Sequence, residues 1–339
     1  MEAKSKLEPA NFYTAADIPD NLPRMTQAGR VMLLGSCFAA NMGTRLQEAK
    51  FRCDVNPYGV LYNPRSISAA LREMLGGKEY AEEDLFQYRG LWHSPMHHGV
   101  FSSEKAEDTL ESINRRLRSA RETLKNGPDY LLITFGTAWV YEDKATGGIV
   151  ANCHKLPEKN FVRRRLSVDE IVEDYTSLLS GMSARNPKLK VLFTVSPIRH
   201  VRDGMHANQL SKSTLLLAVD ALQTVFRGMV YYFPAYELLL DELRDYRFYA
   251  EDMVHPSEVA VRYVWERFSR ACFTAEALQI MEENENIRKA LSHKPFYPAS
   301  DEYKRFLGQI VLKIDRLNGK YPYLDFQKER DICHTRLKV

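Results

Sequence analysis

Residues Val31-Met-Leu-Leu-Gly35-Ser36-Cys37-Phe38 set the architecture that we expect of this chain. Four apolar residues predict a short strand buried on both faces, and Gly35 ends that strand. The same pattern returns three times, and each run is closed by glycine, serine-proline or proline. The three later runs are Tyr130-Leu-Leu-Ile-Thr-Phe135, Val191-Leu-Phe-Thr-Val195 and Val230-Tyr-Tyr-Phe233.

Helical patterns lie between these runs, with apolar residues at steps of three and four. In residues 104–125 such steps connect Ala106, Leu110, Ile113 and Leu117. Strands that are buried on both faces and alternate with helices pack as a parallel sheet between two layers of helices. We therefore expect a three-layer α/β fold. The other helices that we expect cover residues 44–50, 66–75, 168–182, 209–226 and 257–272.

We expect three parts along the chain. Residues 1–27 form an N-terminal extension, residues 28–272 form the α/β domain, and residues 273–339 form a helical C-terminal appendage. The last boundary is placed where the strand patterns stop and two helical patterns begin, at 274–291 and 301–317. Two other regions interrupt the alternation, and we expect ordered turns at 51–63 and a hairpin at 139–156.

Composition limits the function classes. The chain has 339 residues, of which 45% are hydrophobic, so it can bury a large core. A net charge of +3, with both signs interspersed, predicts no nucleic-acid or membrane partner. Five cysteines without CxxC spacing favour a reducing compartment over disulfides or a cysteine zinc site. With no apolar run long enough for a span or signal segment, we expect a cytoplasmic protein, and its oligomeric state is not predicted.

Candidate catalytic residues lie just after the predicted strands. Ser36, Thr137 and Ser196 follow strand ends, and the carboxyl ends of parallel strands meet at the edge where ligands bind. Much later, Asp252-Met-Val-His255 places a carboxylate near an imidazole. A hydroxyl, a base and a group that orients the base are what a serine hydrolase needs.

Structural roles for the same residues remain open. Ser36 is a favoured residue at a helix N-terminus, where its hydroxyl would cap free amides. Asp252 and His255 precede Pro256 and a helical pattern, which is also typical of a helix start. Cys37 is a competing nucleophile, but neighbouring residues point different ways, so we expect only one of Ser36 and Cys37 to face the site.

The motifs resemble those of the GSCFA family, within the SGNH (GDSL-like) hydrolases. The resemblance covers about residues 28–270 and implies a flavodoxin-like sheet and esterase or deacylase chemistry without a metal or other cofactor. It implies that Ser36 is the nucleophile, His255 the general base and Asp252 its orienting partner. The motifs are Gly35-Ser-Cys-Phe-Ala39, Asn56-Pro-Tyr-Gly59, Phe135-Gly-Thr-Ala-Trp139, Ser196-Pro-Ile-Arg-His200, Asp245-Tyr-Arg-Phe-Tyr249 and Asp252-Met-Val-His-Pro-Ser257.

The oxyanion hole departs from the wider superfamily pattern. The resemblance implies donors from the Ser36 amide, from Gly59 and from an asparagine whose position here is held by Ala138. We expect Thr137 to donate instead, with loop asparagines as alternatives. These asparagines are Asn56, Asn63 and Asn152. The residues expected to contact substrate are Asn56, Tyr58, Trp139, Arg199 and His200.

The expected function is hydrolysis of an acyl ester on a small polar molecule. We expect an O-acetyl group on a carbohydrate to be one such substrate, cleaved through an acyl-enzyme on Ser36. The missing asparagine motivates one alternative, a catalytically weak binding module on the same scaffold. The other alternative is an acyltransferase that uses the same three residues. His97-His98 and Cys153-His154 match no metal-ligand spacing, so no metal site is expected.

Overall fold

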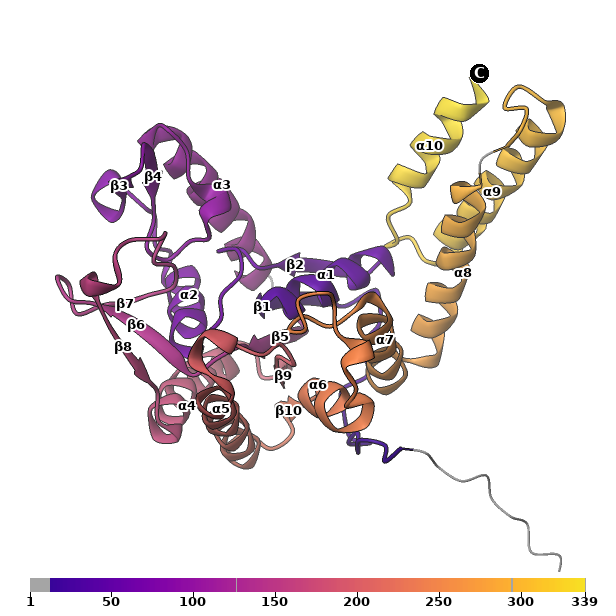
Figure 1. Ribbon diagram of the computed structural model, residues 1–339. Helices are drawn as coiled ribbons and strands as arrows, with labels where there is room; N and C mark the ends of the chain where they lie inside the picture. The colour runs from indigo at the N-terminus through magenta and orange to yellow at the C-terminus, as the bar shows by residue number, and fades with distance from the viewer. Residues whose placement is uncertain (1–12, 126, 294, 339) are drawn as a thin grey trace, which may run out of the picture.

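The computed structural model describes residues 13–125, 127–293 and 295–338, and its centre is a five-stranded parallel sheet (Figure 1). The strand order is β2-β1-β5-β9-β10. Numbered along the chain within this sheet, the order is 2-1-3-4-5, which is the flavodoxin-like arrangement. The predicted fold class is therefore confirmed. The strands are β1 (Arg30–Gly35), β2 (Arg52–Val55), β5 (Tyr130–Phe135), β9 (Lys190–Val195) and β10 (Val230–Tyr232).

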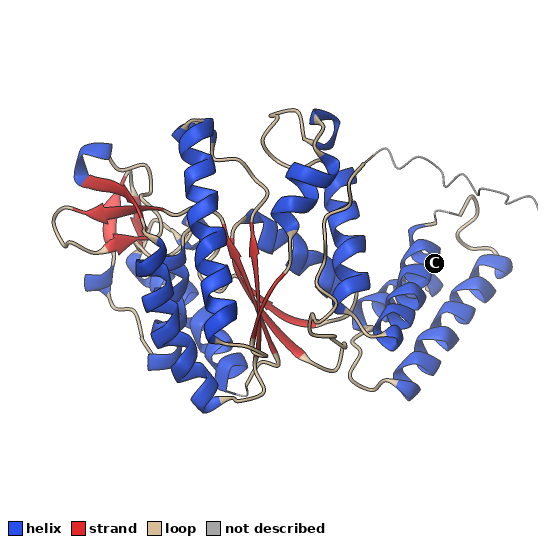
Figure 2. Ribbon diagram, turned by 90° about the horizontal axis from the view of Figure 1, so that it is seen from below, coloured by secondary structure: helices blue, strands red, loops and turns tan. Residues whose placement is uncertain are grey.

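Helices cover both faces of this sheet (Figure 2). Side chains of α1 and α7 pack on one face, and those of α2, α3, α4 and α5 pack on the other. A short α6 and a π-helical segment follow β10. The bounds are α1 (Cys37–Glu48), α2 (Pro64–Gly76), α3 (Ala106–Lys125), α4 (Val168–Arg185), α5 (Met205–Val225), α6 (Ala235–Glu237), the π-helix Leu238–Leu243 and α7 (Glu258–Cys272).

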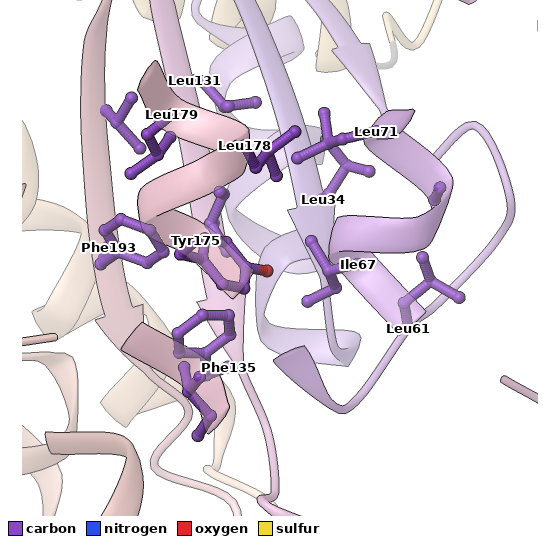
Figure 3. Close-up of a cluster of buried hydrophobic side chains, with 14 of the residues drawn as sticks. Leu34, Leu61, Ile67, Leu71, Leu131, Phe135, Tyr175, Leu178, Leu179 and Phe193 are labelled. Atoms are coloured by element: carbon purple, nitrogen blue, oxygen red, sulfur yellow. The ribbon is translucent and has the colours of Figure 1, made fainter. Parts of the chain in front are cut away.

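Alternate residues of β1 enter two different cores. Met32 and Leu34 join the cluster under α2 to α5, whereas Val31 and Leu33 join the cluster under α1 and α7. Successive side chains of a strand point to opposite faces, so a central strand needs apolar residues at every position. This requirement explains the unbroken apolar run in the sequence. Figure 3 shows Leu34 in the first of these clusters, near Ile67 and Leu71 of α2.

Four strands were not predicted, and two of them, β2 and β8, were missed because their residues are polar. Arg52–Val55, placed among ordered turns, forms the edge strand β2 beside β1. Phe161–Arg165, which includes a run of three arginines, forms β8. The hairpin expected near 139–156 exists as β6 (Trp139–Asp143) and β7 (Ile149–Val150), and β8 pairs with β6 to complete a small antiparallel sheet. A further hairpin joins β3 (Phe86–Tyr88) and β4 (Leu91–His93).

The C-terminal region is helical and projects from the α/β layers (Figure 1). It has its own buried cluster, which includes Ile287, Leu307, Ile314 and Cys333. Beyond the two predicted helical patterns, the segment after residue 320 contains a third helix. The helices are α8 (Ala275–Ser292), α9 (Asp301–Lys320) and α10 (Gln327–Leu337).

The segment before β1 lies partly outside the described residues, which begin at residue 13. Its later part packs on the end of α7. The amide of Met25 donates to the carbonyl of Cys272 at 2.6 Å, and the side chain of Gln27 donates to Ala277 in α8. No helix within the described ranges is long and apolar enough to cross a bilayer.

Candidate active site

Ser36 stands at a sharp turn between β1 and α1. The preceding residue, Gly35, has a φ of +150°, and a Cβ there would lie 2.4 Å from the carbonyl oxygen of Thr134. Only glycine fits, because β5 lies too close for a side chain. The amide of Gly35 donates to Oδ1 of Asn56 at 2.9 Å, which ties the turn to the loop after β2. Ser36 is consequently held at the carboxyl end of the sheet, 2% exposed.

Asp252 and His255 form a hydrogen-bonded pair in the loop before α7. Nδ1 of His255 lies 2.6 Å from Oδ2 of Asp252, while Oδ1 accepts from the amides of Val254 and His255, both at 2.9 Å. The His255 amide and imidazole, with the Val254 amide, lower the pKa of Asp252 to about 2. The ionised carboxylate holds the proton of the imidazole on Nδ1, so Nε2 is left free to accept a proton.

Ser36 and His255 line one cavity of about 420 Å³ at the carboxyl ends of the strands. This is the size range of small-molecule sites. Asp252 does not line the cavity and reaches it only through His255. The three-stranded β6–β8 sheet forms one wall. Polar and aromatic residues around the cavity include Cys37, Tyr62, Asn63, Thr137, Trp139, Tyr141, Arg163, Ser196, Arg199, His200, Arg202 and Asp203.

The hydroxyl of Ser36 also has a capping role. It is the N-cap of α1 and accepts from the amide of Phe38 at 3.3 Å. Within the described residues it makes no hydrogen bond to His255. Catalytic hydrogen bonds are often loose in a free enzyme and tighten in the substrate complex, so this geometry is compatible with either role.

Cys37 lines the same cavity as Ser36, contrary to the expectation that only one of them would face it. Its Sγ lies 3.6 Å from the hydroxyl of Tyr62. Both side chains reach the cavity because Ser36 is the N-cap of α1 and Cys37 is the first residue of that helix. Any labelling experiment must therefore separate the two side chains.

The expected oxyanion donors are placed unequally. Gly59 does not line the cavity, and its amide donates to the carbonyl of Asn56 at 2.8 Å. Thr137 does line it, but its hydroxyl lies 3.1 Å from Oγ of Ser211 and accepts from the amide of Trp139. The Thr137 amide is also occupied, because it donates to the carbonyl of Tyr62 at 2.9 Å. Gly59 therefore offers no donor to the cavity, and the Thr137 hydroxyl is already in contact with Ser211 and Trp139.

Asn63 is placed better than the other two loop asparagines. It lines the cavity and is the N-cap of α2, where Oδ1 accepts from the amide of Ser66 at 2.8 Å. With the oxygen fixed by this bond, the NH₂ group is the free end of the side chain, and it donates to no described residue. Asn56 supports the Gly35 turn instead, and Asn152 accepts from the amide of His154.

Of the expected substrate contacts, Trp139, Arg199 and His200 line the cavity, whereas Asn56 and Tyr58 do not. Tyr58 is fully buried, donates to Glu73 at 2.8 Å and stacks on His97 with ring centroids 4.4 Å apart. Its placement among substrate contacts is therefore wrong. The asparagine-proline-tyrosine-glycine turn directs this ring into the core.

His200 is close to Ser36. A Cβ built on Gly136 would lie 3.5 Å from Nε2 of His200 and 3.5 Å from Cβ of Ser36, so both side chains border the same small space above Gly136. Burial, together with the nearby charges of Lys212 and Arg163, lowers the pKa of His200 to about 4. The imidazole is therefore neutral above about pH 5 and carries a proton on only one of its ring nitrogens.

A family model described as the GSCFA family matches residues 30–268, which is more than half of the chain. The chain belongs to the GSCFA family. A second model, described as the C-terminal domain of GSCFA domain proteins, matches residues 284–339. The search of curated proteins found no match. A crystal structure of a carbohydrate esterase family 3 from Talaromyces cellulolyticus is similar at a TM-score of 0.36 and 13% identity, over 76% of this chain and 99% of that one, too remote to carry an argument.

In this GSCFA protein, a buried lysine that the sequence analysis missed lies beneath the site. Lys212 is 0% exposed, and its Nζ donates to the carbonyls of Gly136 at 2.6 Å and of Ser196 at 2.7 Å. It thereby joins the turns that follow β5 and β9. Burial lowers the pKa of Lys212 to about 7. The signal was present, because Lys212 lies at helical steps from the buried residues Leu215, Val219 and Leu222.

The wall of the cavity contains an ion pair that the sequence did not predict. Arg163 pairs with Asp203, and its guanidinium lies 4.4 Å from the centroid of the Trp139 ring. The arginine run is thus partly structural, since this member fixes the wall of the cavity. Among the residues that the structure describes, no group of three or more His, Cys, Asp or Glu side chains is arranged to hold a metal ion.

Proposed function

We propose that this protein is a serine esterase or deacylase that removes an acyl group from a small polar molecule. One observation carries the proposal: Ser36 and an aspartate-oriented His255, from opposite ends of the α/β region, line the same cavity. A buried hydroxyl and an imidazole with a free Nε2, both lining one cavity, are the parts that nucleophilic catalysis needs.

In the proposed mechanism, Oγ of Ser36 attacks the acyl carbonyl as Nε2 of His255 takes the hydroxyl proton. The new C–O bond to Ser36 gives a tetrahedral oxyanion. When the bond to the leaving alcohol or amine breaks, His255 returns the proton to that group. A water molecule, deprotonated by the same imidazole, then attacks the acyl-enzyme and releases the acid and free Ser36.

We propose that Asn63 supplies the oxyanion donor that Ala138 cannot. Its free NH₂ group lines the cavity, and its oxygen is fixed by the α2 cap, so the donor is held in place before substrate binds. The Cys37 amide at the start of α1 is a further donor, because it is used in none of the described turns, loops or caps. The Ser36 amide faces β5 instead, where the parallel pairing of the two strands ends at Gly35 and Thr134.

The lining favours a polar substrate with a small acyl group. Aromatic rings of Tyr62, Trp139 and Tyr141 lie beside several polar and charged groups around a cavity of about 420 Å³. Flat rings with polar neighbours suit the mixed faces of a sugar. An O-acetylated carbohydrate is therefore the substrate that we would test first.

The test is the intact mass of the protein after reaction with a small fluorophosphonate. We expect one adduct on the wild type, mapped to Ser36, absent in Ser36→Ala and retained in Cys37→Ala. His255→Ala should react at least about 100-fold more slowly, because the hydroxyl loses its base. An adduct on Cys37, or no adduct on a folded wild type, would refute the proposal.

A binding module on this scaffold is the competing function, and the capped hydroxyl of Ser36 favours it. It predicts that ligand affinity is unchanged in Ser36→Ala and that neither form turns over an ester. An acyltransferase would use the same acyl-enzyme, and an added alcohol acceptor would then consume the acyl donor faster than water does.

A further inference from the structure

The arginines around the cavity differ in whether their charge is balanced. Arg163 is paired with Asp203, and Arg202 is paired with Glu158 on the surface. Arg199 forms no ion pair with any residue that the structure describes, although it lines the same cavity and is half-buried. The cavity that contains Ser36 therefore carries one unbalanced positive charge that reaches it from the end of β9.

Aromatic rings hold this guanidinium. Its central carbon lies 5.1 Å from the ring centroid of Tyr249 and 5.8 Å from that of Tyr246. A single contact at 3.5 Å connects Nη1 to the Tyr246 hydroxyl. Ring faces attract a cation but accept no strong hydrogen bonds in its plane, so most of the five N–H donors stay available. The side chain is oriented, but its charge is not neutralised.

The loop that contains Tyr246 and Tyr249 also contains Asp252 and His255. Tyr246 and Tyr249 precede Asp252 and His255 directly, and the loop is closed by the hydrogen bond from the Ala250 amide to the His255 carbonyl at 2.8 Å. A ligand group held by Arg199 would therefore be fixed relative to the general base. A partly buried guanidinium without a carboxylate is suited to a planar anionic ligand, which it can bind through two parallel hydrogen bonds.

We propose that the substrate is anionic, with a carboxylate, phosphate or sulfate group that Arg199 binds while its acyl group lies at Ser36. This inference rests on the proposed function and narrows it to acyl esters or amides of acidic molecules. Neutral acetylated sugars would then be weaker substrates than acetylated acidic ones.

The test compares matched esters that differ only in charge. The 2-, 3- and 4-acetoxybenzoates are each paired with the corresponding acetoxybenzamide. For at least one isomer, we expect the wild type to prefer the benzoate by about 10- to 100-fold in kcat/KM, the effect of one hydrogen-bonded charge. Arg199→Gln should remove this preference by lowering kcat/KM for the benzoate toward the value for its amide partner.

Arg202→Gln is the matched control, because Arg202 lines the same cavity but has a carboxylate partner. It should keep the preference for benzoates. Equal kcat/KM values for all three wild-type pairs, or a preference that survives in Arg199→Gln, would overturn the anion site.

A second measurement keeps this test separate from the proposed chemistry. Calorimetric binding of the hydroxybenzoates and hydroxybenzamides requires no turnover. If no ester is hydrolysed, tighter binding of a hydroxybenzoate to the wild type than to Arg199→Gln still supports the anion site, while the esterase proposal fails. If esters are hydrolysed and neither assay depends on charge, the anion site fails alone.

Discussion

The oxygen of the Asn63 side chain caps α2, whereas its NH₂ group has no described partner, so a substitution can remove the NH₂ group and keep the cap. Asn63→Ser retains an oxygen for the α2 cap but loses the NH₂ donor. We expect kcat to fall by about 10²–10³-fold with little change in KM, because the lost hydrogen bond forms fully only in the transition state. Steady-state kinetics on the best ester, with Tm as the check on folding, measures this.

His200 provides the comparison for that experiment, because its Nε2 also borders the space beside Ser36. If Asn63 is the donor, His200→Asn should lower kcat much less than Asn63→Ser does. The opposite ranking would assign the oxyanion to His200. The pH profile should not show an ionisation of His200 above pH 5 in either case, since its pKa is lowered to about 4.

In the proposed mechanism, Asp252 acts through the orientation of His255. Asp252→Asn should lower kcat by about 10²–10⁴-fold, because the amide favours the wrong imidazole tautomer. Tm should change little, because both side chains are about half exposed.

The pKa of Asp252 is lowered to about 2 in the folded protein, so its carboxylate interactions are present above the unfolded pKa. They are lost only as the pH falls toward 2. Activity of the wild type between pH 5 and 9 should therefore show no step from this carboxyl, and a Tm loss without loss of kcat would contradict the role.

At the scale of elements, Lys212 joins the turns after β5 and β9 at the cost of a buried charge. Its pKa of about 7 lies below the ordinary value of 10.5, so between these values the unfolded chain binds a proton that the folded chain has released. The free energy of unfolding should therefore rise from pH 7 to 9, with a slope of up to about 1.4 kcal/mol per pH unit. Urea unfolding at pH 7, 8 and 9 should show this slope in the wild type and a flatter one in Lys212→Met. An equal slope in both proteins would contradict the assignment.

A substitution of Tyr58 tests whether this residue supports the buried core or contacts the substrate. Tyr58→Phe removes a hydrogen bond to Glu73, which keeps its bond from Tyr80 at 2.7 Å. We expect a loss of about 1–2 kcal/mol in the free energy of unfolding, with kcat/KM unchanged. A variant with altered KM and unaltered stability would return Tyr58 to the substrate contacts.

The central strands were predictable because burial on both faces demands an unbroken apolar run. Such runs mark β1, β5, β9 and β10 in the sequence. The edge strand β2 and the wall strand β8 were not predictable, since Arg52–Val55 and Phe161–Arg165 meet neither a double-sided core nor a clean alternation. Their pairing depends on the partner strands β1 and β6, which lie outside the two segments themselves.

The candidate site likewise contains residues that the sequence predicts and residues that it does not. Ser36, Asp252 and His255 follow from local spacing and from the family motifs. The available oxyanion donor does not, because it depends on which polar groups of Gly59, Thr137 and Asn63 are already occupied by other partners. Lys212 was missed for a related reason: a buried charge is costly in general, and only the two carbonyls above it make this one acceptable.

On the scale of the whole molecule, the C-terminal helices dock at the end of α1 that is remote from Ser36. Asn284 donates to the carbonyl of Glu48 at 2.5 Å, and Lys50 pairs with Glu329 of α10 at 2.8 Å. Twelve helical residues, about 18 Å at 1.5 Å per residue, separate this contact from the catalytic turn. The appendage is therefore placed to support the domain and not to contact substrate.

Glu329→Gln tests this arrangement. The side chains of Lys50 and Glu329 are only 12% and 10% exposed, so the substitution leaves a largely buried ammonium without its counter-charge. We expect a loss of about 3 kcal/mol, faster hydrogen exchange in α10, and unchanged kcat. Glu111→Gln is the control, because its pair with Arg115 is exposed on both sides. A fall in kcat without faster exchange would show that the appendage acts on the site directly.

The distance along the chain between Ser36 and His255, more than 200 residues, has a consequence during synthesis. A ribosome releases Ser36 early, but His255 emerges only after every strand of the parallel sheet has been made. A nascent chain that stops before residue 255 can hold an ordered N-terminal half and still be inert. Reactivity of Ser36 toward a fluorophosphonate would thus report synthesis past residue 255 and closure of the α/β domain.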